Sequence, residues 1–153
     1  MRKRATFFLL TVLSASAGTL VAAPPESFEK TIPVPRTGVA KLGWTSDRCS
    51  VVSVELRNYP DAEDVEKARQ KDPNDHSWVW WQFNVENRGD SKCRIRLWVE
   101  VLDKSGNVLK QGDRSDTVDA HKNEDEIRLS TRMKTIDIAD APKARLRAEI
   151  GPK

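Results

Sequence analysis

The chain has 153 residues, with 26 Lys and Arg against 23 Asp and Glu, which gives a formal net charge of +3. This length suits one domain with a core of its own and is too short for two ordinary domains. Arg2, Lys3 and Arg4 lie in an N-terminal segment typical of an export signal, and without them 23 basic residues face 23 acidic ones. A net charge near zero lacks the basic surplus that generic nucleic-acid binding needs, so no nucleic-acid partner is expected.

Residues 1–23 are predicted to be a signal peptide. MRKR is a positively charged start, and the apolar run ATFFLLTVLS is shorter than the ~20 residues that cross a bilayer. Ala15-Ser16-Ala17 has the A-x-A form of a cleavage site, and Ala22 or Ala23 offers a later cut. The alternative is an uncleaved membrane anchor, if the apolar run is counted through to Ala23. With cleavage, the mature chain is expected to be periplasmic or secreted, without stable membrane insertion.

Residues 24–37 are predicted to form an extended lead-in or an edge segment. They include four prolines, from Pro24 to Pro35. Proline lacks a backbone N–H and restricts φ, so it is unsuited to a central strand. The folded domain is therefore expected over residues 38–153.

The dominant period within this domain is two residues, which is typical of half-buried β-strands. Turn residues at 87–90 and 103–107 resemble hairpin connections. About seven such strands predict an all-β fold, an immunoglobulin-like antiparallel β-sandwich. The side chains expected on the core side are Val52, Val54 and Leu56; Val79, Trp81, Phe83 and Val85; Cys93, Ile95, Leu97, Val99 and Val101; and Ala144, Leu146, Ala148 and Ile150.

Residues 60–73 interrupt this alternation. The segment PDAEDVEKARQKDP contains strong helix formers, Asp61 as a candidate cap and Pro73 as a stop signal. It predicts one short helical excursion between two strands. A charged loop is the alternative.

Cys49 and Cys93 are the two cysteines, and an even count in an exported chain predicts one disulfide. Closing such a loop restricts the unfolded chain by up to ~4 kcal/mol in the entropic account. Two buried free thiols are the alternative. Cys93 lies on the core side of its strand, whereas Cys49 is out of phase with Val52 and Val54. Cys49 therefore either precedes the regular strand or lies near a bulge.

The stretch WWQFNVENRGDSKCRIRLWVEVLDKSGNVLKQG resembles the FxLYD group of small immunoglobulin-like domains of exported bacterial proteins. The resemblance covers roughly residues 79–150. It implies an accessory or binding module and no catalytic residue. The positions that correspond to the family motif are Val99, Val101 and Leu102, followed by Asp103 and Gly106.

Two groups of polar residues are candidates for chemistry. His76 and His121 lie in polar loops, where each is a candidate base for a hydrolase, although solvated loop histidines are commoner. An acidic stretch lacks the residue order of an EF-hand, so a charged turn region is favoured over a Ca²⁺ site. The acidic residues of this stretch are Asp113, Asp116, Asp119, Glu124, Asp125 and Glu126. We expect no enzyme activity, no metal and no cofactor.

The candidate binding residues are aromatic and basic: Trp78, Trp80, Trp98, Arg94 and Arg96. All five lie on the outward side of their strands. If the two strands pair as a hairpin about residues 88–91, Trp80 and Trp98 share one outer face. Exposed Trp and Arg are enriched at binding hot spots. The alternative is that residues 24–37 or 60–73 fold over these rings and bury them.

The favoured interpretation is a non-catalytic exported binding or accessory module that engages a protein or cell-envelope component through this face. One alternative is a secreted inhibitor or assembly factor that offers an edge strand to another chain. A second alternative is a hydrolase that uses His76 or His121.

Overall fold

The computed structural model describes residues 22–153, so the predicted signal peptide lies outside the described residues apart from Ala22 and Ala23. Within the described part of the chain, no helix has the length and hydrophobicity required to cross a membrane. The elements in chain order are β1 (Glu26–Pro33), β2 (Val39–Ser46), β3 (Cys49–Arg57), α1 (Ala62–Gln70), β4 (His76–Asn87), β5 (Cys93–Leu102), β6 (Val108–Val118), β7 (Lys122–Lys134), α2 (Thr135–Asp140) and β8 (Lys143–Pro152).

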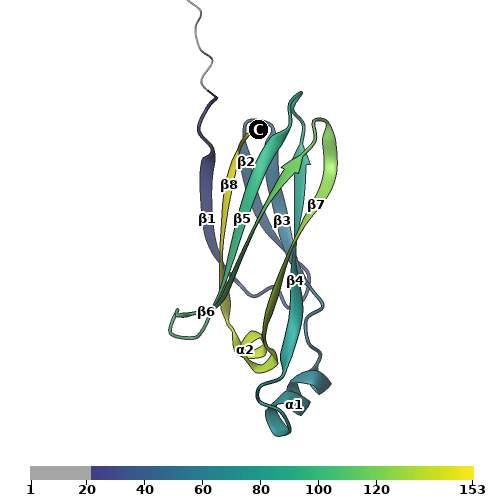
Figure 1. The fold of residues 1–153 in the computed structure, drawn as a ribbon, viewed down its shortest axis with the longest axis vertical. Coiled ribbons are helices and arrows are strands. Elements are labelled where there is room, and N and C mark those ends of the chain that lie inside the picture. Colours follow the sequence, from purple (N-terminus) through teal and green to yellow (C-terminus); the bar gives the residue numbers. More distant parts are fainter. Residues whose placement is uncertain (1–21) are drawn as a thin grey trace, which may run out of the picture.

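The strands form two antiparallel four-stranded sheets that pack face to face (Figure 1). One sheet has the order β1-β8-β5-β6 and the other has the order β2-β3-β4-β7. The prediction of an all-β antiparallel sandwich is confirmed, with eight strands instead of about seven. Each sheet buries one face, as alternating strands require.

The core is built from the inward side chains of both sheets. Every core residue predicted in β4, β5 and β8 is buried, and Trp81 is fully enclosed. Trp44 of β2 adds a second buried indole, stacked on Phe28 of β1 with 6.1 Å between ring centroids. Ile138 of α2 is also fully buried. These apolar side chains supply most of the free energy that favours folding.

A β-bulge at Val52 corrects the predicted pattern of β3. The register between β3 and β4 shifts between Val51 and Ser53, so Val52 is an extra residue without a partner. Val52 is therefore half-buried and not in the core, whereas Cys49 and Val51 are buried before it and Val54 after it. The bulge moves the inward side of the strand by one residue. It explains why Cys49 is out of phase with Val54 and still reaches the core.

Two further features differ from the prediction, the start of the sandwich and the burial of one side chain. Residues Glu26–Pro33 pair along their length with β8 as the edge strand β1, so the sandwich begins at Glu26 and not at residue 38. Pro33 is accommodated because it ends an edge strand. The alternation of β5 also predicts Leu102 on the outer side, together with Trp98 and Glu100, but Leu102 is buried.

The predicted helix is confirmed as α1. Asp61 caps it, accepting a hydrogen bond from the backbone N–H of Asp64 at 2.8 Å. The helix α1 lies beside α2 at one end of the sandwich (Figure 1), and Arg69 of α1 forms an ion pair with Asp140 of α2. The helix α2 was not predicted because its six residues contain Thr and Ile and it has no side-chain cap.

Candidate binding surfaces on the two outer faces

The strands β4 and β5 do not pair as a hairpin, because each belongs to a different sheet. The predicted single face around Trp80 and Trp98 is therefore wrong. Trp80 lies on the outer side of β2-β3-β4-β7, and Trp98 lies on the outer side of β1-β8-β5-β6. The structure brings Trp78 and Trp80 together on the first face. It brings Arg94, Arg96 and Trp98 together on the second.

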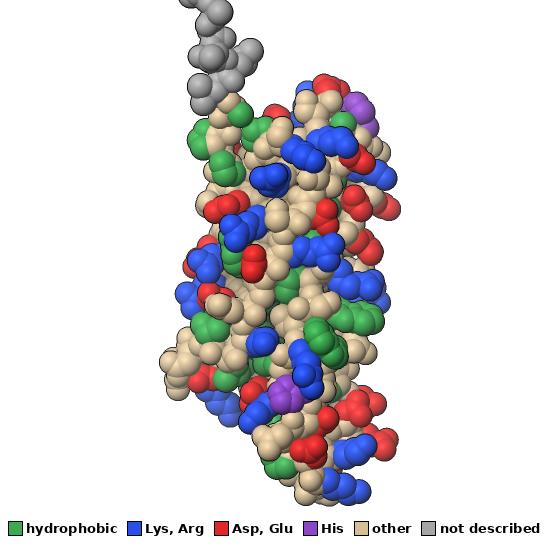
Figure 2. Space-filling view, viewed as in Figure 1, with side chains coloured by type: hydrophobic (Ala, Val, Ile, Leu, Met, Phe, Trp, Pro, Cys, Tyr) green, Lys and Arg blue, Asp and Glu red, His purple; other side chains and the backbone are tan. Residues whose placement is uncertain are grey.

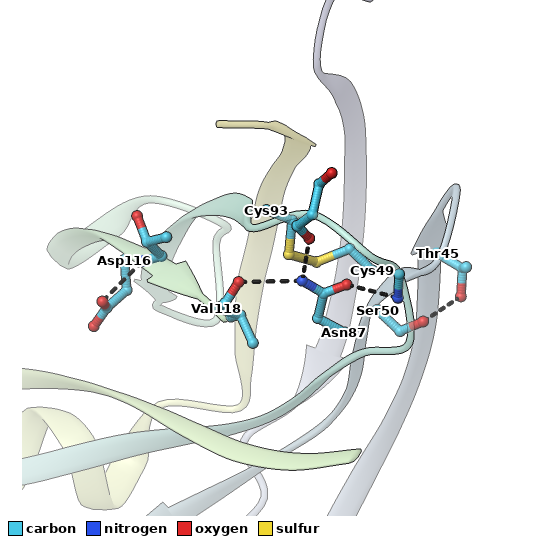
Figure 3. Close-up of a disulfide and its surroundings, with 10 residues drawn as sticks. Thr45, Cys49, Ser50, Asn87, Cys93, Asp116 and Val118 are labelled. Carbon is cyan, nitrogen blue, oxygen red and sulfur yellow. Dashed lines mark hydrogen bonds between the residues drawn. A yellow bond between two sulfur atoms is a disulfide. The ribbon is translucent and has the colours of Figure 1, made fainter. Parts of the chain in front are cut away.

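The link between β4 and β5 carries the chain from one sheet to the other (Figure 3). Asn87, which is 1% exposed, holds this crossover with its side-chain amide. Its Nδ2 donates to the carbonyl oxygens of Ser91 at 2.8 Å and Val118 at 3.1 Å, and its Oδ1 accepts from the N–H of Gly89 at 3.0 Å. The amide thereby satisfies backbone groups that a hairpin turn would pair differently.

The Cys49–Cys93 disulfide lies beside this crossover and joins β3 of one sheet to β5 of the other. Its formation confirms the predicted disulfide, and no free cysteine is present among residues 22–153. Figure 3 shows the bridge next to Asn87. The covalent link and the buried amide together fix β5 opposite β4. They also fix Trp98 on the face opposite Trp80.

On the outer side of β2-β3-β4-β7, Trp78 is 52% exposed and Trp80 is half-buried. The register places Arg132 of β7 opposite Trp78, and it places Arg57 of β3 opposite Trp80. The guanidinium of Arg128 lies 4.8 Å from the ring centroid of Trp80, a cation–π contact. These five residues, Trp78, Trp80, Arg57, Arg128 and Arg132, are called the Trp78–Trp80 face below.

The carboxylates beside this face are turned away from two of its arginines. Glu55 accepts from Arg57 at 2.7 Å and from the side chain of Gln82 at 3.3 Å. Glu126 accepts from the same Gln82 amide at 2.8 Å. Within residues 22–153, neither Arg128 nor Arg132 forms an ion pair. The Trp78–Trp80 face therefore carries positive charge that its neighbours do not neutralise.

Neither segment predicted as a lid covers the rings. The strand β1 extends the edge of the other sheet, and α1 packs against α2. Asn58, just before α1, approaches the face only through its Nδ2, which donates to the backbone carbonyl of Trp78 at 2.6 Å. The indole of Trp78 remains half exposed. The alternative in which the chain buries all these rings is therefore wrong.

The outer side of β1-β8-β5-β6 is a network of ion pairs around a half-buried Trp98. The guanidinium of Arg96 lies 4.6 Å from the Trp98 ring centroid, and that of Arg147 lies 6.0 Å from it. Arg147 donates to Glu100 at 2.8 Å, and Arg96 pairs with Asp113 at 3.4 Å. Figure 2 shows basic and acidic side chains intermingled over this side of the molecule.

The outward charges of this second face nearly balance. The register of β1, β8, β5 and β6 gives five basic and four acidic outward positions. Most of them pair with one another, and Arg94 and Lys143 are the exposed basic members that take part in no ion pair among the described residues. The positions are Arg94, Arg96, Lys143, Arg145 and Arg147 against Glu29, Glu100, Asp113 and Glu149.

The two histidines lie near opposite ends of the molecule (Figure 2). The Nδ1 of His76 is 2.6 Å from the backbone carbonyl of Asn74, and the Nε2 of His121 is 3.4 Å from Asp90. Both imidazoles are exposed. The hydrolase alternative stays a prediction.

The acidic stretch is distributed over the β6–β7 region and does not form one cluster. Asp113, Asp116 and Asp119 each lie beside a different basic side chain, those of Arg96, Arg114 and Lys92 respectively. The Lys92 ammonium, 2.7 Å from the Asp119 carboxylate, lowers the pKa of that group by a hydrogen bond and by its charge. Within the described residues, no group of three or more His, Cys, Asp or Glu side chains is placed to hold a metal ion.

The edges of the two sheets are partly blocked. Arg114 of β6 donates to the backbone carbonyl of Arg128 of β7 at 3.1 Å, and Lys30 of β1 donates to that of Lys41 of β2 at 3.2 Å. The inward side of β6 also carries Lys110, Arg114 and Asp116, charges that oppose the addition of another strand. The edge-strand alternative stays a prediction, and these contacts count against β6 as the strand offered.

Three residues of the Trp78–Trp80 face were missed from the sequence: Arg57, Arg128 and Arg132. They come from β3 and β7, which flank β4 but are distant from it in the chain. The alternation around Ile127 and Leu129 places Arg128 and Arg132 outward. That signal gives the side of the strand and not the neighbouring strand, so the pairing with β4 was not predictable.

The chain matches no protein-family model, and a comparison with curated proteins found no significant match. The resemblance to the FxLYD group therefore stays a prediction.

Proposed function

We propose that this protein is a non-catalytic exported binding module that engages a protein or cell-envelope partner through the Trp78–Trp80 face. The observation that carries the proposal is the half-exposed indole of Trp78 beside Trp80, with two arginines that lack ion-pair partners among the described residues. The sequence of the N-terminal segment and the Cys49–Cys93 disulfide support a periplasmic or secreted location.

Trp and Arg at the centre of such a face match the residue types that dominate binding energy at protein interfaces. An exposed indole offers a large, rigid apolar surface, and burying it against a partner removes that surface from water. Ser130, exposed on β7 opposite Trp80, is an uncharged polar side chain that suits the rim of an interface.

Site-specific photo-cross-linking tests the proposal. Ser130, opposite Trp80, is replaced with p-benzoylphenylalanine in the exported protein, and cells are irradiated before the envelope and medium are analysed. Ser115 is the matched control, because it is an exposed serine of an edge strand on the opposite face, opposite Arg96. We expect a discrete adduct from position 130 that Trp78→Ala abolishes.

Equal adducts from positions 115 and 130 would show that the Trp78–Trp80 face has no special role. An adduct from position 115 alone would show that the partner binds the face around Trp98 instead. The Trp78→Ala variant must retain its disulfide and its cooperative unfolding, so that loss of the adduct reports on contact and not on folding.

A further inference from the structure

We infer that the occupant of the Trp78–Trp80 face is an acidic, extended segment of a partner protein. This inference rests on the proposed function and specifies the chemistry of the partner. Its support comes from the charge of the face, from the spacing of the arginines, and from the features of the face that disfavour a bilayer or a sugar chain.

The charge of the face calls for an anionic partner. Arg128 and Arg132 lack ion-pair partners among the described residues, and the next outward position of β7 adds Lys134. The nearest carboxylates, those of Glu55 and Glu126, are held by the amide of Gln82. Guanidinium groups bind carboxylates with two parallel hydrogen bonds, so carboxylates are the natural complement of this face.

The spacing of the arginines specifies how the partner's acids are arranged. Arg128 and Arg132 are four residues apart on one side of β7, which separates their Cα atoms by about 13 Å. Two carboxylates four residues apart in an extended chain have the same spacing. Ser130 lies between the two arginines and leaves room for the partner backbone.

Trp78 supplies the apolar contact. Trp78 is paired with Arg132 across the β4–β7 ladder. A partner's apolar side chain that packs on Trp78 would therefore lie next to a partner's carboxylate that binds Arg132. The inferred segment therefore carries acidic residues at positions i and i+4, with an apolar or aromatic residue beside one of them.

Two other anionic partners fit the face less well. An anionic bilayer lying on this sheet would approach Glu55, Glu86 and Glu126, which share the outer side of the same sheet and would be repelled by lipid phosphates. An acidic glycan needs free ring faces for stacking, but the Arg128 guanidinium already covers the ring of Trp80. A polypeptide requires only one exposed indole and the two arginines.

The test uses a random copolymer of glutamate and tyrosine as the probe, immobilised on a biosensor surface. A lysine–tyrosine copolymer controls for charge. Phosphatidylglycerol vesicles and polygalacturonate represent the lipid and glycan classes. The proteins are the mature chain, the Arg128→Gln/Arg132→Gln variant and the Arg94→Gln/Arg96→Gln variant, which removes the same charge from the opposite face.

We expect the mature chain to bind the glutamate–tyrosine copolymer and not the lysine–tyrosine copolymer. The Arg128→Gln/Arg132→Gln variant should weaken binding about tenfold, the combined effect of two exposed charge pairs, whereas Arg94→Gln/Arg96→Gln should leave it within about twofold. About 0.5 M NaCl should weaken binding by the mature chain, because the contacts are exposed to screening.

Equal loss in both double variants would overturn the inference, because binding would then follow net charge. Preferential binding to the vesicles or to polygalacturonate would overturn it in favour of that class. Failure to bind any probe, with a Trp78-dependent cross-link at position 130, would overturn the acidic segment and leave the proposed function standing. If the cross-link were lost as well, both the inferred acidic segment and the proposed function would be overturned.

Discussion

The two outer faces of the sandwich carry similar residue types and arrange them in opposite ways. Around Trp98, the arginines that contact the ring are themselves bound to carboxylates, as Arg147 is to Glu100 and Arg96 to Asp113. Around Trp80, the stacked Arg128 has no ion-pair partner within residues 22–153. The arginines that contact Trp98 are paired with carboxylates, whereas the arginine that contacts Trp80 is not, among the described residues.

The difference separates Trp and Arg side chains that are engaged within the protein from Trp and Arg side chains that remain available to a partner. A guanidinium that already pairs with a carboxylate gains little from a new partner, because the old pair must first be broken. An unpaired guanidinium beside an exposed indole keeps both its charge and its apolar contact available. Composition alone therefore does not distinguish the two faces, whereas the pairing of their charges does.

The largest expected effect separates the core side of β4 from its outer side. Trp81 is fully buried and its Nε1 donates to Thr131 at 3.3 Å, so Trp81→Ala should lower the free energy of unfolding by about 3–5 kcal/mol. Trp78→Ala, three residues earlier and half exposed, should lower it by less than about 1 kcal/mol. Urea unfolding followed by far-ultraviolet circular dichroism measures both. Comparable losses would mean that Trp78 is a structural residue.

The second effect concerns the disulfide that keeps the two faces on opposite sheets. Cys49→Ala/Cys93→Ala should lower the free energy of unfolding by about 2–4 kcal/mol, because the unfolded chain is released from a closed loop. The buried amide of Asn87 should still hold the crossover, so quenching of Trp fluorescence by iodide should change little. A large rise in quenching would show that the covalent link alone separates the faces.

The third effect compares one carboxylate on each face. Glu100 is only 13% exposed and binds both Arg145 at 3.1 Å and Arg147 at 2.8 Å, so Glu100→Gln should lower the free energy of unfolding by about 1–2 kcal/mol. Glu126→Gln, on the face of Trp80, should change it by less than about 0.5 kcal/mol because no arginine depends on it. Equal effects would erase the contrast between the faces.

The alternation of residues was sufficient to predict the sandwich, because the choice between core and solvent repeats every two residues in β4, β5 and β8. It failed at Val52, where a register shift changes the side on which the following residues lie. Bulges depend on the partner strand as much as on local sequence. The only indication of a bulge in the sequence was that Cys49 is out of phase with the core side chains of its strand.

The composition of the proposed binding face was predicted only in part, for a related reason. Trp78 and Trp80 were placed on the outer side of β4 correctly, but their neighbours depend on which strands flank β4. The turn residues Asn87-Arg88-Gly89-Asp90 resembled a hairpin, yet Asn87 uses its side chain to hold a crossover between sheets. Local turn chemistry cannot distinguish these two outcomes, because the deciding hydrogen bond reaches Val118, far along the chain.

The smallest expected effect concerns Asp103 in the β5–β6 turn, which belongs to the sheet that carries Trp98. Hydrogen bonds from the side chain and N–H of Asn107 lower the pKa of Asp103 below its ordinary value, and the N–H of Ser105 adds another. A carboxyl whose pKa is lowered by folding stabilises the folded state while it is ionised. That contribution is present above the ordinary carboxyl pKa of about 4 and is lost as the pH falls through the lowered value.

Asp103→Asn should therefore lower the melting temperature slightly at neutral pH, and the difference from the unmodified chain should shrink as the pH falls below about 4. Lys104→Gln, an exposed change in the same turn, is the control and should show no such convergence. Differential scanning calorimetry over this pH range measures the gap. A gap that persists in acid would mean that the turn depends on the shape of the Asp103 side chain and not on its charge.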